Sequence, residues 1–182
     1  MSNFYTDVPL EDISQGSVDV DSGVNETEVY FLPAAHATGV PGLPVVDPSL
    51  GLAELATLTG EFTLVADKFW KRIPLLVDQS EVKQESVGSK GQSRYKSTFE
   101  FLIGGTDAQK LGFGRVILNT PGYYAVKQRS GQVVIVGSAN SPAWTMSGSV
   151  TFGKGAEDVV GGTYTVESNS IAALFTGVIA TE

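Results

Sequence analysis

Candidates for acid–base or nucleophilic chemistry are sparse in this chain. It has no cysteine and a single histidine, His36, which lies in a stretch rich in proline and glycine. The lack of cysteine excludes disulfides, cysteine-ligated zinc and a thiol nucleophile. No carboxylate lies close to His36 in the sequence, so we interpret it as an exposed loop histidine.

Two neighbouring carboxylate pairs and two glycine-rich runs are the other features that could do chemistry. Glu11-Asp12 and Glu157-Asp158 are adjacent residues, whose side chains point in opposite directions in a strand. Gly112-Phe113-Gly114 lacks the third glycine of a dinucleotide fingerprint, and Gly88-Ser89-Lys90-Gly91 lacks the Lys-Ser/Thr pair of a phosphate loop. We therefore expect no catalytic residue, cofactor or metal, and a protein that is not an enzyme.

The charge of the chain is negative and unevenly distributed. Twenty acidic and 12 basic residues give a net charge of −8, and no Lys or Arg occurs before residue 68. This sign disfavours broad binding of nucleic acid. We interpret residues 1–26 as an acidic arm and residues 27–182 as a single β-rich domain. Glu11, Asp12, Asp19 and Asp21 of the arm could serve self-assembly or line a channel, and a solvated tail is the alternative.

Most of the remaining chain is typical of β-strands. Residues 94–103 alternate between apolar and polar side chains, which predicts a half-buried strand. Residues 61–77 predict a hairpin around Asp67-Lys68, and residues 123–136 predict another around Arg129-Ser130-Gly131. Further strands are expected at 28–32, 52–58, 143–152, 163–168 and 171–179. Trp70, Trp144, Phe99, Phe101 and Phe113 are expected in the core.

One helix is expected, at residues 106–118. Thr106 and Gln109 fit a capping box, and Asn119-Thr120-Pro121 should end the helix. Gly112 and Gly114 indicate close packing, and we expect the helix to cover the outer face of a sheet. The fold class is thus all-β with one packed α-helix, a β-barrel or sandwich.

Residues 78–93 are polar and predict a long exposed loop. Its cations form a small basic patch with those of the following strand. Because the chain is acidic overall, this patch suits an acidic neighbouring copy better than nucleic acid. The residues expected to contact another subunit are Lys83, Gln84, Glu85, Lys90, Arg94 and Lys96.

The second half of the chain resembles the tail tube (major tail) proteins of tailed bacteriophages. The resemblance covers residues of about 60–180, and its motifs are turns and packing positions. They run through Phe99-Glu100-Phe101-Leu102-Ile103-Gly104-Gly105-Thr106-Asp107-Ala108, Leu111-Gly112-Phe113-Gly114-Arg115, Arg129-Ser130-Gly131-Gln132, Val134-Ile135-Val136-Gly137-Ser138, Asp158, Gly161-Gly162-Thr163 and Thr176-Gly177.

The resemblance implies a virion structural protein located in the tail and assembled in the host cytoplasm. A β-barrel or sandwich flanked by one helix would be copied six times into a ring, and stacked rings would form a tube. Its partners would be copies of itself and other virion proteins. DNA would pass through the channel without sequence-specific binding, and an acidic lumen would repel phosphate.

Two other classes of function remain open from the sequence. The chain could be another virion component: a head decoration protein, a tail terminator or a fibre base. It could instead be a carbohydrate-binding β-sandwich, with Trp70, Trp144, Tyr123 and Tyr124 as stacking platforms. No signal peptide opens the sequence and no stretch approaches the roughly 18 apolar residues of a membrane helix. We therefore expect no membrane partner.

Overall fold

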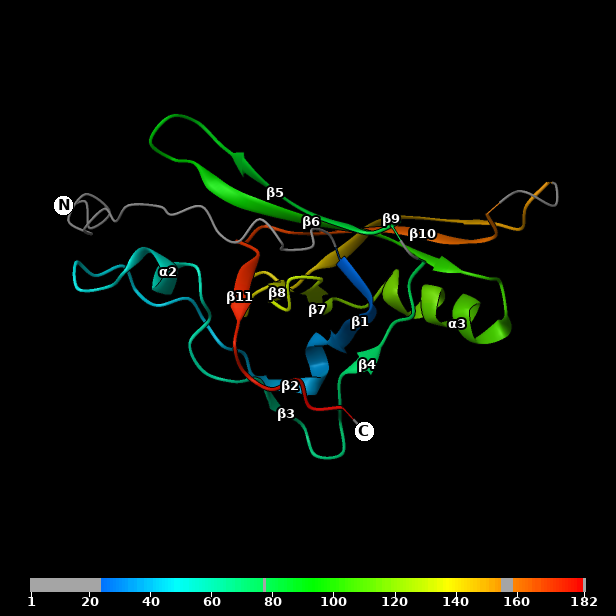
Figure 1. Ribbon diagram of the computed structural model, residues 1–182, viewed down its shortest axis with the longest axis horizontal. Helices are drawn as coiled ribbons and strands as arrows, with labels where there is room; N and C mark the ends of the chain where they lie inside the picture. Colours follow the sequence, from blue (N-terminus) through cyan, green and yellow to red (C-terminus); the bar gives the residue numbers. More distant parts are fainter. Residues whose placement is uncertain (1–23, 77, 155–158, 182) are drawn as a thin grey trace.

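Two antiparallel sheets packed face to face form the body of the protein. The computed structural model describes residues 24–76, 78–154 and 159–181. The first sheet has the order β11 (Ala173–Phe175), β8 (Val133–Val136), β7 (Gly122–Gln128), β1 (Val24–Pro33) and β4 (Lys71–Arg72). The second has the order β5 (Glu81–Val87), β6 (Arg94–Gly104), β10 (Gly161–Ser168) and β9 (Trp144–Thr151) (Figure 1). Among the described residues neither sheet closes on itself, so these residues form no closed barrel.

Smaller elements connect or cover the two sheets. A 3-10 helix, η1 (Ala34–His36), and a two-stranded ladder of β2 (Ala37–Gly39) and β3 (Thr63–Leu64) follow β1. The helices are the single turn α2 (Leu52–Leu55) and the longer α3 (Ala108–Ile117). The mostly β class with one substantial helix, predicted from the sequence, is confirmed.

The main hydrophobic core lies between the two sheets. The period-two alternation predicted for β6 is confirmed from Ser97 to Phe101: Phe99 and Phe101 are buried, while Glu100 on the other face is exposed. At the ends of the strand it does not hold, since Leu102 is buried as well as Ile103, and Tyr95 is exposed. Phe99 and Phe101 stack with ring centroids 4.8 Å apart, and both approach Tyr124 of the first sheet, at 5.8 and 5.9 Å. Aromatic packing of this kind holds the second sheet against the first.

A second apolar cluster covers the other face of the first sheet. Alternate residues of β7 belong to different clusters, since Tyr124 contributes to the first and Tyr123 to the second. Trp70 is 2% exposed there, with Phe62 packed edge-on at 5.0 Å. The first sheet is therefore buried on both faces, whereas the second has a covered face and an uncovered one.

Helix α3 packs on the inner face of the second sheet, beside the first sheet. Its Ile117 is fully buried in the main core, together with Tyr164 of β10. The helix thus covers the face of the second sheet that is directed toward the first sheet. The predicted N-cap is wrong by one residue, because the carboxylate of Asp107 accepts the backbone N–H of Lys110 at 3.0 Å.

Three further predictions of local structure are corrected. Residues 52–55 form a helical turn, not a strand. The segments around Asp67-Lys68 do not pair as a hairpin, since β3 pairs with β2 and β4 pairs with β1. Within the expected loop of residues 78–93, residues 81–87 form strand β5, which pairs with β6 along its whole length. Because an edge strand that buries few side chains can be as polar as a loop, the composition of residues 81–87 does not distinguish the two.

Candidate assembly surface

We call the face of the second sheet that points away from the first sheet its uncovered face; it is mostly polar. Because side chains alternate along a strand, Glu100 and Leu102 of β6 lie on this face, where Glu100 is exposed and Leu102 is buried. The same alternation places small hydroxyl residues on this face: Thr163 and Thr165 of β10, and Ser147, Ser149 and Thr151 of β9. Lys96 of β6 and Glu167 of β10 form an ion pair here, with Nζ and Oε2 2.8 Å apart.

The two edges of this sheet differ in character. The β5 edge carries the charged residues Glu81, Lys83 and Glu85. Strand β9 has no charged residue, and seven of its eight residues are exposed. Trp144 is 49% exposed and Met146 63% exposed. Among the described residues β9 pairs with β10 on one side only, so its other backbone edge is open.

The hairpin of β5 and β6 carries the six residues expected to contact another subunit. Gln84 is already used within the chain, since its Oε1 accepts the backbone N–H of Ala172 at 2.9 Å. Lys83 lies 3.0 Å from Glu81, whose hydrogen bond and negative charge raise the pKa of the lysine. Lys90 at the turn and Arg94 are exposed. The structure gathers these residues on one projecting hairpin (Figure 1).

The acidic residues predicted to line a channel, Glu11, Asp12, Asp19 and Asp21, lie outside the described residues. His36 ends η1 and is partly exposed. No group of three or more His, Asp and Glu side chains that could hold a metal ion is found in residues 24–76, 78–154 and 159–181.

The strand expected at residues 143–152 is confirmed as β9, but the sequence does not predict that it forms an exposed edge. The expectation that Trp144 lies in the core is wrong, since Trp144 points out of the second sheet. The sequence gives no signal of this exposure, since Trp144, Met146 and Val150 alternate with Thr145, Ser147 and Ser149 as in a half-buried strand. Phe113, expected in the core, packs against its rim and is only partly buried.

The aromatic residues considered as a sugar-binding platform are mostly inside the protein. Trp70, Tyr123 and Tyr124 are between 1% and 4% exposed, and Trp144 alone of the four reaches the surface. Burial raises the pKa of the Tyr124 phenol above its ordinary value. A platform for sugar rings needs exposed faces, so this set of residues does not form one.

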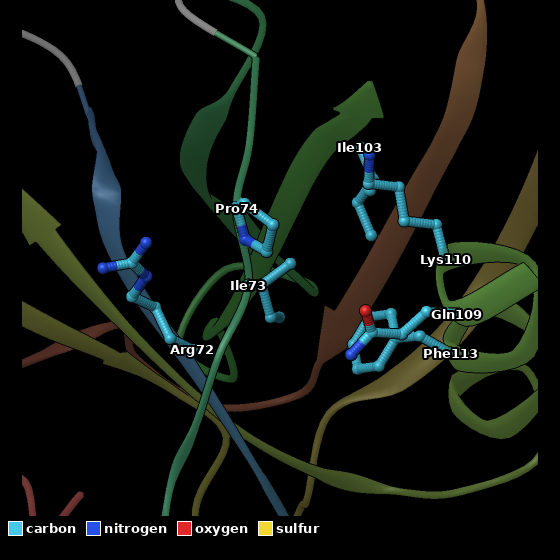
Figure 2. Close-up of a pocket in the computed structure, with 7 residues that line it drawn as sticks. All are labelled: Arg72, Ile73, Pro74, Ile103, Gln109, Lys110 and Phe113. Atoms are coloured by element: carbon cyan, nitrogen blue, oxygen red, sulfur yellow. The ribbon is translucent and has the colours of Figure 1, made fainter. Parts of the chain in front are cut away.

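A small cavity separates the segment after β4 from helix α3, with a volume of about 140 Å³. It is lined by Arg72, Ile73 and Pro74 on one side, by Gln109, Lys110 and Phe113 of α3 on the other, and by Ile103 of β6 (Figure 2). Lys110 pairs with Asp107 at 3.0 Å, and the hydrogen bonds from Lys110 lower the pKa of that carboxyl.

No known protein family, curated protein or solved structure matches this chain. Within the part of the chain that the structure describes, the helices are too short or too polar to span a bilayer. The structural and chemical features above are therefore the basis on which a function is proposed.

Proposed function

We propose that this chain is a structural protein of a bacteriophage virion that assembles into rings, which stack to form the tail tube. The proposal rests on one observation above all: the second sheet has an uncovered polar face and ends in the open, uncharged strand β9. Six copies in each ring is the number that the resemblance to tail tube proteins implies.

The open edge of β9 favours a strand as its partner. Each unpaired N–H and C=O along such an edge can bond to another backbone, and an uncharged exposed edge does not prevent this pairing. The apolar side chains of Trp144 and Met146 would lose water on contact, which adds a hydrophobic contribution. Self-association through β9 therefore agrees with its chemistry.

The strand order of the second sheet is compatible with a closed ring. Each of the pairs β5–β6, β6–β10 and β10–β9 is antiparallel, so the two edge strands β5 and β9 run in opposite directions. If one copy is rotated so that its β5 meets the β9 of its neighbour, the new pair is also antiparallel. Repeating this head-to-tail contact by rotation generates a ring.

The uncovered face would then line the channel. By strand register it carries the carboxylates Glu81, Glu85, Glu100 and Glu167 and the cations Lys83, Arg94 and Lys96. The remaining residues there are mostly Ser and Thr, together with the apolar Leu102 and Trp144. A nearly neutral hydroxylated wall has no concentrated positive charge to hold phosphates, which favours passage of DNA over binding.

Electron microscopy of the purified full-length protein tests the proposal. We expect rings or tubes of uniform diameter with a central channel, formed in the absence of other proteins. A protein that stays monomeric at high concentration, at low and at moderate salt, would contradict the proposed function. Open amyloid-like fibrils without a channel would contradict it as well, because they would show pairing without ring closure.

A further inference from the structure

Strands β5 and β9 form the two edges of the second sheet, and among the described residues each has one partner strand (Figure 1). The N–H of Gly105, just after β6, bonds to the carbonyl of Val160 at 2.8 Å, on the β10 side. The carbonyl of Leu102 points to the other side, where it accepts the N–H of Leu76 at 2.9 Å. Because this direction alternates along an antiparallel strand, the odd-numbered residues of β6 face β10 and the even-numbered ones face β5.

At both edges the backbone groups that point outward belong to residues of the inner face, the face directed toward the first sheet. In β9 the backbone of Ser149 faces β10, which leaves the N–H and C=O groups of Gly148 and Val150 at the open edge. In β5 the odd-numbered residues face β6, which leaves those of Val82 and Gln84 at the other edge. Antiparallel pairing of β5 with β9 can therefore satisfy both edges and keep the two faces of the sheet continuous.

An apolar surface lies beside the open edge of β9 on the inner face. Leu111 and Leu118 of α3 and Val150 of β9 are between 37% and 43% exposed. Leu111 and Val150 line a narrow crevice with Tyr164, and Leu118 lies next to Gly148. A strand added at this edge would bring the side chains of its own inner face against these residues.

We propose that β5 of one copy pairs with β9 of its neighbour in a single register, with Val82 opposite Val150. This inference rests on the ring proposed above and names the contact that closes it. The register places residues 81–85 opposite residues 147–151, so the whole of β9 beyond its bulge is paired. Val82 and Val150 then exclude water from each other beside the apolar surface of α3.

Other registers fit the side chains less well. A shift by one residue would turn the inner-face residues of β5 to the uncovered face. A shift by two residues would place a polar side chain opposite Val150, either Ser80 or Gln84. Of the inner-face residues of β5, only Val82 is apolar. The register with Val82 opposite Val150 is therefore the one that combines a full ladder with an apolar pair.

Disulfide trapping on the uncovered face tests the register, because the natural chain has no cysteine. The register places Ser149 opposite Lys83 as a pair that exchanges no backbone hydrogen bonds, in which the Cα atoms are about 4.5 Å apart. This separation is within the range of a disulfide. One full-length protein carries Ser149→Cys, and a second, with a size tag, carries Lys83→Cys. We expect a crosslinked heterodimer on mild oxidation.

Glu81→Cys and Glu85→Cys are the matched controls for Lys83→Cys, since they lie on the same strand and face, two residues to either side. Each would be a diagonal neighbour of Ser149→Cys, with Cα atoms about 7–8 Å apart. We therefore expect both to crosslink about tenfold more slowly than Lys83→Cys. Faster or equal trapping at 81 or 85 would overturn the register. Rapid homodimers of Ser149→Cys alone would overturn it too, because β9 would then pair with another β9.

A protein that carries Ser149→Cys and Lys83→Cys together separates this inference from the proposed tube. Within one subunit β6 and β10 hold the two positions roughly 14 Å apart, so each link joins two copies. We expect a ladder of crosslinked species that ends at the size of the ring. A ladder without an upper limit would support the register and refute the ring. Rings seen by electron microscopy without the 149–83 link would refute the register alone, and monomers without any link would refute both.

Discussion

Gly114 of helix α3 lies directly against the hydroxyl of Tyr164 on β10, and a Cβ at position 114 would overlap that hydroxyl. This contact brings the helix onto the second sheet at close range, so α3 and the inner face of β10 form one packed unit. The other glycine inside the helix, Gly112, has no atom within 4 Å of the place where a Cβ would stand. The two glycines thus provide a matched pair of substitutions.

Gly114→Ala should destabilise the protein by about 1–3 kcal/mol, because the new methyl group must displace the helix or Tyr164. Gly112→Ala should instead leave stability unchanged or raise it by up to about 1 kcal/mol, since alanine is the better helix former at an exposed position. Urea denaturation of both variants measures the difference. Equal effects at the two positions would contradict the close packing of α3 on β10.

Asp107→Ala should lower the urea midpoint more than Thr106→Ala, because Asp107 caps α3. The pKa of Asp107 is below its ordinary value of 3.8, so the ionised form is favoured in the folded state. The ionised carboxylate of Asp107 therefore stabilises the folded protein above pH 3.8. This stabilisation declines as the pH falls through the lower pKa that Asp107 has in the folded state. The difference in the free energy of unfolding between wild type and Asp107→Ala should become smaller in acid. A difference that does not change with pH would show that the charge of Asp107 does not contribute.

Ser147→Lys should abolish self-association while leaving the fold intact. The residue is exposed in the middle of β9, and a lysine there would place a charge beside the open edge. Ser130→Lys, on the exposed turn between β7 and β8, is the matched control and should assemble normally. Light scattering and electron microscopy give the readout, and circular dichroism checks folding. Normal tubes from Ser147→Lys would show that β9 is not at the contact.

Tyr124 should remain protonated in alkali until the protein unfolds. Burial raises the pKa of its phenol, so the unfolded chain loses this proton at lower pH than the folded protein does. The contribution to stability is present below the ordinary pKa of 10.0 and declines as the pH rises above it. As the pH rises from about 9 to about 11, an interval that brackets the normal tyrosine pKa of about 10, the free energy of unfolding should therefore fall less for Tyr124→Phe than for wild type. Urea denaturation at each pH measures this difference. An unchanged pH slope would contradict this assignment.

Local patterns predicted the elements whose side chains divide cleanly between core and solvent. The alternation of β6, the β7–β8 hairpin and the existence of α3 all follow from such patterns. The cap was misplaced by one residue because Thr106 and Asp107 are both good N-cap residues, and backbone geometry selects between them.

Elements that depend on their neighbours could not be predicted in this way. Polar residues 81–87 form a strand only because β6 offers them a backbone edge. The short strands β3 and β4 are close in sequence but join different sheets, since each pairs with a strand that precedes it by more than 20 residues. The exposure of Trp144 could not be predicted either, because the size of a side chain does not reveal whether its strand lies at the edge of a sheet.

By itself the sequence determined the β class, the acidic character of residues 1–67 and the lack of thiols, because these depend on residue type and short-range spacing. Only the tertiary structure decided that β9 is an open edge, that hydroxyl residues gather on an uncovered face, and that Gly114 meets Tyr164. Those properties arise when segments distant in the chain pair and pack, and the pairing partner of a strand is set by long-range burial that no local pattern records.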